Sequence, residues 1–135
     1  MTDLVGGCLC GEVRYSTAAE PVFTAICHCK NCQKQAGTAF SVVMAFPTGS
    51  LSIDGSLKAY QDKGDSGQPV HRNFCPQCGS PITSVVSAMP NLVFLKAGTL
   101  DDTAQLKPTM EIYCSSAQPW VAANGETQKF AKGPG

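Results

Sequence analysis

The pattern of hydrophobic and polar positions along this chain predicts a protein built mainly from short β-strands. Residues 40–46 form a nearly continuous apolar run that is rich in valine and phenylalanine and too short for a helix. Residues 12–16 alternate instead, with Val13 and Tyr15 on one side of the segment, as in a half-buried strand. Five further segments have the composition of short strands, namely residues 57–60, 70–74, 82–87, 92–97 and 110–113.

Turn-forming residues between these segments complete the prediction. Glycine, proline, aspartate and asparagine recur there and favour tight turns. Many short strands joined by turns are typical of an all-β domain, so we expect a mainly β fold. We predict one short helix, over residues 31–36 and ended by Gly37, and a polar loop over residues 62–68.

Length and charge narrow the possible functions. The 135 residues suit one small domain, which we place at residues 1–130, followed by a loose tail at residues 131–135. Ten basic and ten acidic side chains cancel, which argues against a nucleic acid or a membrane surface as a partner held by overall charge. Because the sequence shows neither a signal-peptide pattern nor an apolar stretch of membrane-spanning length, we expect a soluble, cytoplasmic protein.

The cysteines carry the strongest chemical signal in the sequence. Eight are present: seven form the groups Cys8/Cys10, Cys27/Cys29/Cys32 and Cys75/Cys78, and Cys114 stands alone. A disulfide framework is one explanation, but it suits secreted proteins, whereas a reducing compartment keeps thiols free. Cysteines separated by one residue also bridge each other poorly. The spacing therefore favours metal binding, and zinc is the metal that thiolate clusters of this kind usually hold.

Two of the groups together make a complete four-thiolate site. In Cys75-Pro76-Gln77-Cys78-Gly79, the proline fixes the backbone after the first cysteine and the glycine can adopt a positive φ after the second. In an extended segment, Cys8 and Cys10 would point to the same side, and Leu9 would point into the core. We predict that these four cysteines hold a structural zinc ion that joins the start of the chain to its middle.

The third group offers only three thiolates within six residues. Cys27 and Cys29 share one side of an extended segment, and Cys32 returns after a turn. Three protein ligands and one open position are what a catalytic zinc ion requires. The alternative is a second closed site, with Cys114 or His28 as the fourth ligand, although His28 should point away from its two neighbours.

Three motifs resemble those of a known family. They are Gly6-Gly7-Cys8-Leu9-Cys10-Gly11-Glu12-Val13-Arg14-Tyr15, Cys27-His28-Cys29-Lys30-Asn31-Cys32-Gln33-Lys34 with Gly37, and Phe74-Cys75-Pro76-Gln77-Cys78-Gly79-Ser80-Pro81-Ile82. In this order they are similar to the glutathione-dependent formaldehyde-activating enzyme (Gfa) family, also called the centromere protein V/Gfa domain. The resemblance implies a β-tent fold of short antiparallel strands and two zinc ions. It implies a structural ion on Cys8, Cys10, Cys75 and Cys78, and an accessible one on Cys27, Cys29 and Cys32.

The resemblance also implies a reaction. The family joins formaldehyde to glutathione, giving S-(hydroxymethyl)glutathione, and is classed by the reverse reaction as a carbon–sulfur lyase. A small thiol and an aldehyde would then be the partners of this chain. Lys30, Lys34 and Arg72 lie beside the ligand segments and could bind an anionic thiol, or they could be solvated surface residues. The alternatives are a zinc-binding module without catalytic activity and a thiol redox sensor. The oligomeric state is left open by the sequence.

Overall fold

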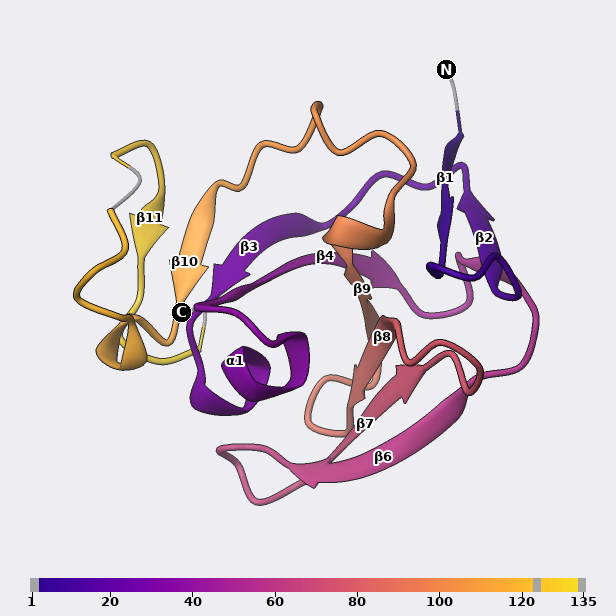
Figure 1. Cartoon of the computed structure of the whole chain (residues 1–135). Coiled ribbons are helices and arrows are strands. Elements are labelled where there is room, and N and C mark those ends of the chain that lie inside the picture. Colours follow the sequence, from indigo (N-terminus) through magenta and orange to yellow (C-terminus); the bar gives the residue numbers. More distant parts are fainter. Residues whose placement is uncertain (1–2, 123–124, 134–135) are drawn as a thin grey trace.

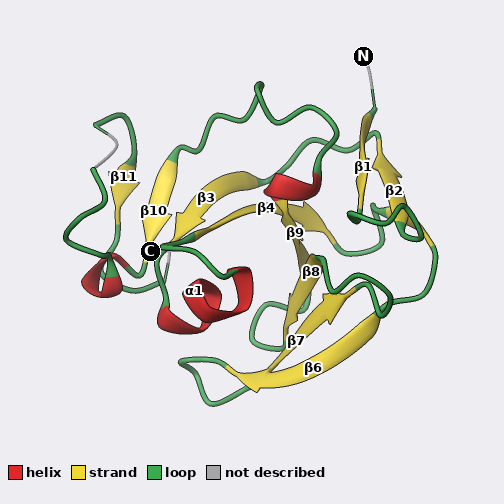
Figure 2. Ribbon diagram, viewed as in Figure 1, coloured by secondary structure: helices red, strands yellow, loops and turns green. Residues whose placement is uncertain are grey.

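The structure is a computed structural model that describes residues 3–122 and 125–133. Strands make up most of its regular structure and the helical segments are short (Figure 2), so the prediction of a mainly β fold is confirmed. In chain order the elements are β1 (Leu4–Gly7), β2 (Arg14–Thr17), β3 (Phe23–Cys27), α1 (Lys30–Ala36), β4 (Ser41–Pro47), β5 (Ser52–Asp54), β6 (Lys58–Lys63), β7 (Pro69–Phe74), β8 (Pro81–Val86), β9 (Leu92–Lys96), η1 (Ala97–Thr99), β10 (Met110–Ile112), η2 (Cys114–Ser116) and β11 (Gln128–Lys129).

The strands form one large and one small sheet. The large sheet has the order β11-β10-β3-β4-β9-β8-β7-β6, and the small sheet has the order β1-β2-β5. Neighbouring strands are antiparallel, except that β10 runs parallel to both β3 and β11. Figure 1 shows the large sheet curving around α1, from β11 through β3 and β4 to β6, with β1 and β2 standing at one side. This curvature places the short helix opposite the middle of the sheet.

The central strand β4 is buried on both of its faces. Met44 and Phe46 belong to the main hydrophobic core, which also contains residues of the small sheet. Val43 and Ala45 point to the other face and pack in a second cluster with Phe94 of β9. A strand buried on both faces reads as a continuous apolar run rather than an alternating one. This double burial explains the run that the sequence shows at residues 40–46.

Four strands were not predicted from the sequence. The strands β5 and β11 are only three and two residues long, and they are exposed along their whole length. The strand β1 contains Gly6 and Gly7, which disfavour a strand by composition. Gly6 is needed there, because a β-carbon would collide with the Tyr15 ring and the Thr99 carbonyl oxygen. The fourth unpredicted strand, β3, is five residues long and ends at Cys27, the first cysteine of the second motif.

The helix prediction is confirmed, and the loop prediction needs one correction. α1 ends at Gly37, whose φ of 71° is the left-handed conformation that glycine adopts easily. The predicted loop at residues 62–68 begins later, because β6 continues to Lys63 and pairs with β7. Asp62 remains in the strand because its carboxylate binds Arg72 on the neighbouring strand.

The last described residues lie against the segment that follows β10. The Tyr113 amide donates to the Lys132 carbonyl oxygen at 2.8 Å, and the Ser115 amide donates to the Ala131 carbonyl oxygen at 3.2 Å. Residues 134–135 of the expected tail lie outside the described residues. Among the residues that the structure describes, no helix has the length and apolar character needed to cross a membrane.

Phe46 is the largest side chain fully buried in the main core, which leads to a first prediction. Phe46→Ala should lower the free energy of unfolding by about 3–5 kcal/mol, because the change removes buried apolar area and leaves a cavity. Tyr60→Ala is the matched control, since Tyr60 is 63% exposed and its loss should cost about 0.5 kcal/mol or less. Urea unfolding of the two zinc-loaded variants measures the difference; equal losses would contradict this description of the core.

Candidate metal centres and the adjoining cavity

The first cysteine group joins the two sheets. Cys8 follows β1 of the small sheet, whereas Cys75 and Cys78 lie in the turn between β7 and β8 of the large sheet. The four sulfur atoms of Cys8, Cys10, Cys75 and Cys78 lie within 4.8 Å of one another. The Sγ atoms of Cys8 and Cys10 lie 3.5 Å apart, and those of Cys10 and Cys75 lie 3.7 Å apart. The structure therefore brings together the four residues that spacing had paired.

These distances fit a tetrahedral zinc–thiolate site. Four Zn–S bonds of about 2.3 Å place the sulfurs about 3.8 Å apart at the corners of a tetrahedron. Backbone amides also point at the sulfurs: Val13 donates to Cys8 Sγ at 3.2 Å, and Gln77 donates to Cys75 Sγ at 3.4 Å. Amide donors of this kind stabilise sulfur in its negatively charged form. The four sulfur ligands therefore suit a zinc ion in their number, their spacing and their negative charge.

Ser80 connects the two ligand segments without any metal. Its Oγ accepts a hydrogen bond from the Leu9 amide at 3.0 Å and lies 3.2 Å from Cys78 Sγ. Hydrogen bonds from Ser80 lower the pKa of the Cys78 thiol to about 5. Gly79 has a φ of 81°, as the sequence predicted for the residue after the second cysteine. The turn thus holds Cys78 ready as a thiolate.

Two details of the Cys8–Cys10 prediction were wrong. The segment is a turn rather than an extended strand, with the Gly11 amide donating to the Cys8 carbonyl oxygen at 3.2 Å. Leu9 does not enter the core; its side chain is 89% exposed. Both sulfurs reach the same point because the chain reverses between them, so Leu9 lies on the outside of the turn.

The second cysteine group lies where β3 passes into α1. Cys27 ends β3, Cys29 is the residue that caps α1, and Cys32 lies in the first turn of the helix. The Cys32 amide donates to Cys29 Sγ at 3.2 Å, a capping contact that fixes this sulfur. The three sulfurs lie within 4.8 Å of one another. As predicted, the two cysteines in the extended segment and the one after the turn meet at one point.

Two buried cations face this group. Arg72 on β7 is 7% exposed, and its Nη1 lies 3.7 Å from Cys32 Sγ. Lys96 at the end of β9 is 5% exposed and donates to Ser41 Oγ at 3.1 Å. Arg72 also donates to Asp62 through Nε at 2.9 Å. Burying two cations is costly unless negative charge lies nearby, and the thiolates supply that charge.

The pKa values of the cysteines in this group are shifted in different directions. Hydrogen bonds from Cys27 and Cys29 lower the pKa of Cys32 to about 2, and the positive charges of Lys96 and Arg72 act in the same direction. The hydrogen bond to Cys29 and the nearby charge raise the pKa of Cys27. Burial lowers the pKa of Lys96, whereas the negative charge of Cys32 opposes that effect. The contacts within the group and the two buried cations thus favour the thiolate form of Cys32.

His28 and Cys114 belong to a different cluster. As predicted, His28 points away from its two cysteine neighbours, and its Nε2 lies 2.7 Å from Glu111 Oε1. Glu111 also accepts a hydrogen bond from Thr127. Cys114 begins η2, two residues after the end of β10, and its sulfur groups with His28 and Glu111. Neither alternative fourth ligand joins the three-cysteine group in the described part of the chain.

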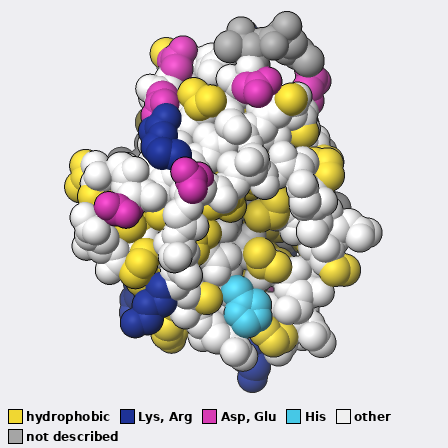
Figure 3. Space-filling model, turned by 90° about the vertical axis from the view of Figure 1, so that its right-hand side faces the viewer, with side chains coloured by type: hydrophobic (Ala, Val, Ile, Leu, Met, Phe, Trp, Pro, Cys, Tyr) yellow, Lys and Arg dark blue, Asp and Glu magenta, His cyan; other side chains and the backbone are white. Residues whose placement is uncertain are grey.

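A cavity of about 500 Å³ opens beside the three cysteines. Its charged lining is predominantly basic, comprising Lys30, Lys63, Arg72, Lys96 and Lys132, with Asp65 as the acidic residue among the described lining. Half of the ten lysines and arginines of a chain with no net charge therefore surround this one cavity. By contrast, the face shown in Figure 3 carries both acidic and basic side chains. The cavity is thus the region that is suited to an anionic ligand.

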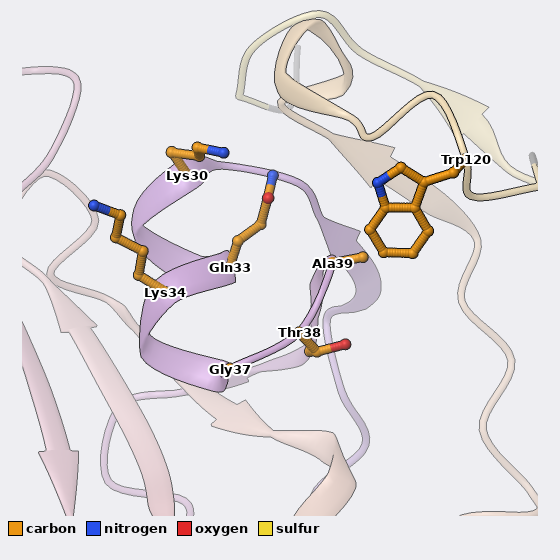
Figure 4. Close-up of a pocket in the computed structure, with 7 residues that line it drawn as sticks. All are labelled: Lys30, Gln33, Lys34, Gly37, Thr38, Ala39 and Trp120. Atoms are coloured by element: carbon orange, nitrogen blue, oxygen red, sulfur yellow. The ribbon is translucent and has the colours of Figure 1, made fainter.

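A shallower hollow of about 380 Å³ lies on the other side of α1. Figure 4 shows the exposed indole of Trp120 opposite α1, with Gln33 projecting from the helix. Gln33 holds this segment in place by donating to the Ser116 carbonyl oxygen and accepting from Gln118. Lys30 lines both this hollow and the larger cavity. The hollow offers few buried polar groups, so we place the chemistry in the larger cavity.

Sequence reasoning found the cysteines but missed part of their surroundings. Arg72 was among the candidate cations because it lies three residues before Cys75, yet it faces the other cysteine group. Lys96 gave no sequence signal, since it ends an ordinary apolar strand far from any cysteine in the chain. A lysine that follows a run of apolar residues does not by itself indicate a functional site. Lys96 reaches the site only because β9 pairs with β4.

Comparisons with known proteins agree with the geometry. A family model described as "Glutathione-dependent formaldehyde-activating enzyme" matches residues 3–116. Two curated proteins, from Talaromyces marneffei and Emericella nidulans, bear the name "Putative glutathione-dependent formaldehyde-activating enzyme" and are 33% and 32% identical over 75 and 74 residues. Each alignment covers 53% of this chain but only 38% and 36% of the respective relative, so the chain spans well under half of either protein.

A solved structure supports the fold. The crystal structure of a Rhodobacter sphaeroides protein superposes with a TM-score of 0.58 and 18% identity, over 77% of this chain and 91% of that one. At this identity the likeness concerns the fold alone. The family model, in contrast, spans well over half of the chain and all three cysteine motifs. The chain therefore belongs to the glutathione-dependent formaldehyde-activating enzyme family.

Proposed function

We propose that this chain is a zinc-dependent carbon–sulfur lyase that joins a small thiol such as glutathione to an aldehyde such as formaldehyde. In the reverse direction it would cleave the adduct, S-(hydroxymethyl)glutathione. The observation that carries the proposal is the position of Cys27, Cys29 and Cys32 on the wall of a cavity with predominantly basic charged groups. Membership of the family supports the same reaction.

The proposal assigns two zinc ions with different roles. Cys8, Cys10, Cys75 and Cys78 would hold a structural ion, since four thiolates complete its coordination. Cys27, Cys29 and Cys32 would hold the second ion and leave one position for a ligand from the cavity. When bound, this zinc would lower the pKa of a thiol and keep it as a thiolate at neutral pH.

The bond changes in the proposed step are simple. The thiolate sulfur forms a bond to the carbonyl carbon, the C=O electron pair moves to oxygen, and that oxygen takes up one proton. No oxidation or reduction is involved. Lys96 is a buried cation on the cavity wall and would stabilise the negative charge that develops on the oxygen. Arg72 would offset the excess negative charge of the thiolates through its contact with Cys32.

The rim of the cavity fits the rest of glutathione. Lys30, Lys63 and Lys132 are exposed and line the opening, whereas Arg72 and Lys96 are buried further in. Glutathione carries two carboxylates and one ammonium group. An arrangement of exposed lysines around a thiol-binding centre would attract these carboxylates and orient the sulfur inward.

The two proposed zinc ions give a prediction about metal content. Native mass spectrometry of the wild type should show two zinc ions. Cys8→Ser should lose the structural ion and destabilise the fold, since binding to such a site contributes directly to folding. Cys29→Ser should remain folded and contain one ion fewer. If Cys29→Ser unfolds as readily as Cys8→Ser, the division into a structural and an open site is wrong.

The proposed reaction is tested by the rate at which glutathione and formaldehyde equilibrate with their adduct. Exchange measured by NMR should be at least roughly tenfold faster with zinc-loaded protein than without it, which corresponds to about 1.4 kcal/mol of barrier. Cys29→Ser should return the rate to the uncatalysed value. No acceleration by a protein that holds both ions would reject the enzyme and favour a zinc-binding module without catalytic activity.

The basic rim gives a prediction about affinity. The double variant Lys63→Gln/Lys132→Gln should raise the KM for glutathione about three- to fivefold, since each exposed charge pair is worth up to about 1 kcal/mol. The increase should shrink at high salt, because salt screens exposed charges. Lys58→Gln/Lys107→Gln changes the net charge equally but away from the cavity, and serves as the control. Equal effects of the two double variants would show that overall charge, rather than the rim, attracts the thiol.

A further inference from the structure

One face of the large sheet forms the wall of the cavity. Because side chains alternate along a strand, Phe23 and Cys27 of β3 point to the same side, as do Phe94 and Lys96 of β9. Val43 of β4 lies between these strands and also lines the cavity. Cys27 and Phe23 are four residues apart, which corresponds to about 13 Å along a strand. The cavity therefore has a thiol end and a second end well separated from it.

The second end is apolar. Phe23 and Phe94 form a tilted aromatic pair with ring centroids 6.1 Å apart. Val86 and Met89 pack against the buried cluster that contains Phe94, and both also line the cavity. These side chains come from β3, β8, β9 and the β8–β9 turn, so several elements contribute to one apolar wall.

Ser84 lies between the apolar wall and the buried cations. It is 5% exposed, lines the cavity, and pairs across the sheet with Phe94 on one side and Arg72 on the other. Its Oγ is buried without a hydrogen-bond partner in the part of the chain that the structure describes. A buried hydroxyl without a partner is costly. Ser84 therefore marks the boundary between the apolar wall and the buried cations.

Formaldehyde alone does not match this cavity. It has no apolar substituent, so it would leave the partly exposed side chains of Phe23, Val86 and Met89 uncovered. A volume of about 500 Å³ lies within the range of about 300–1,000 Å³ that is typical of cavities for drug-sized ligands. The peptide part of glutathione cannot fill the apolar end favourably either, because its charged groups would lose their hydration there. The apolar wall is therefore better matched by an aldehyde that carries an apolar group.

We propose that the preferred substrate is the thiol adduct of an aldehyde that carries an apolar chain or ring. The sulfur would lie at the three cysteines, the oxygen would lie near Lys96, and the apolar group would cover the partly exposed side chains of Phe23, Val86 and Met89. The reaction is the one proposed above: a C–S bond forms, the C=O electron pair moves to oxygen, and one proton is taken up there. This inference rests on the proposed function and narrows its substrate class.

The first test compares aldehydes as substrates. With zinc-loaded protein and glutathione, the catalysed rate constant kcat/KM is divided by the uncatalysed rate constant for formaldehyde, butanal and hexanal. The quotient should rise with chain length, by up to about fourfold for each methylene group that becomes buried. A quotient that is flat or falls from formaldehyde to hexanal would overturn the inference, even if formaldehyde itself is accelerated.

The second test measures binding without catalysis. S-Hexylglutathione and S-methylglutathione are stable analogues of the adduct that differ by five methylene groups. Calorimetry should show that the hexyl compound binds at least roughly thirtyfold more tightly, against an upper bound of about a thousandfold for complete burial. Equal affinities would reject the apolar wall as a binding surface.

Neighbouring residues of β8 provide a matched pair of variants. Val86→Phe fills the apolar end, whereas Val85 is 37% exposed and points to the opposite face, so Val85→Phe adds the same bulk elsewhere. Val86→Phe should reduce the hexyl-to-methyl affinity ratio at least tenfold, and Val85→Phe should preserve it. Ala88→Phe fills the same end from an exposed position and replaces Val86→Phe if that variant melts at a much lower temperature. Equal ratios in the filled and control variants would contradict the assignment.

The two tests distinguish a failure of the substrate assignment from a failure of the proposed lyase activity. Acceleration of formaldehyde with no preference for longer aldehydes rejects the inference and retains the lyase. A strong preference for S-hexylglutathione with no acceleration of any aldehyde rejects both the lyase and the aldehyde assignment. Agreement of the rate and affinity preferences, both lost in the filled variant, supports the inference.

Discussion

The alternation of side chains along the central strands is the constraint on which the rest of the structure depends. On β4, Met44 and Phe46 enter the main core, whereas Val43 faces the cavity. On β9, Leu95 enters the same core, whereas Lys96 faces the three cysteines across the cavity. A shift of either strand by one residue would exchange the two faces, placing a lysine in the core and core side chains at the site. The same strand register therefore determines both which side chains form the main core and which side chains face the site.

The four-cysteine group connects this sheet to the small one. Cys8 and Cys75 are both buried within the main core, so the proposed structural ion would lie at its edge rather than on a separate appendage. Ser80 contacts both ligand segments and would keep them aligned while a metal ion binds. The free energy of metal binding would then stabilise the packing of the two sheets. It would add to backbone contacts such as the isolated bridge between Gly6 of β1 and Leu100, which follows η1.

The three-cysteine group and the buried cations depend on each other. Three thiolates carry more negative charge than one zinc ion neutralises, and a bound thiolate would add to the excess. Arg72 and Lys96 supply two positive charges at low exposure, and Asp62 fixes the arginine by an ion pair. Without the thiolates, two cations in this position would be strongly unfavourable. The buried cations and the proposed zinc–thiolate centre would therefore offset each other's charge.

The sequence by itself determined the mainly β class, the short helix ended by Gly37, and the grouping of seven cysteines, because strand periodicity, turn residues and ligand spacing are local features. Only the tertiary structure decided that Leu9 is exposed and that Lys96 and Ser84 reach the cavity. The same structure separated Cys114 from the three-cysteine group. These outcomes depend on which strands pair and in which register. Pairing between distant segments is set by the packing of the whole sheet, which no short stretch of sequence encodes.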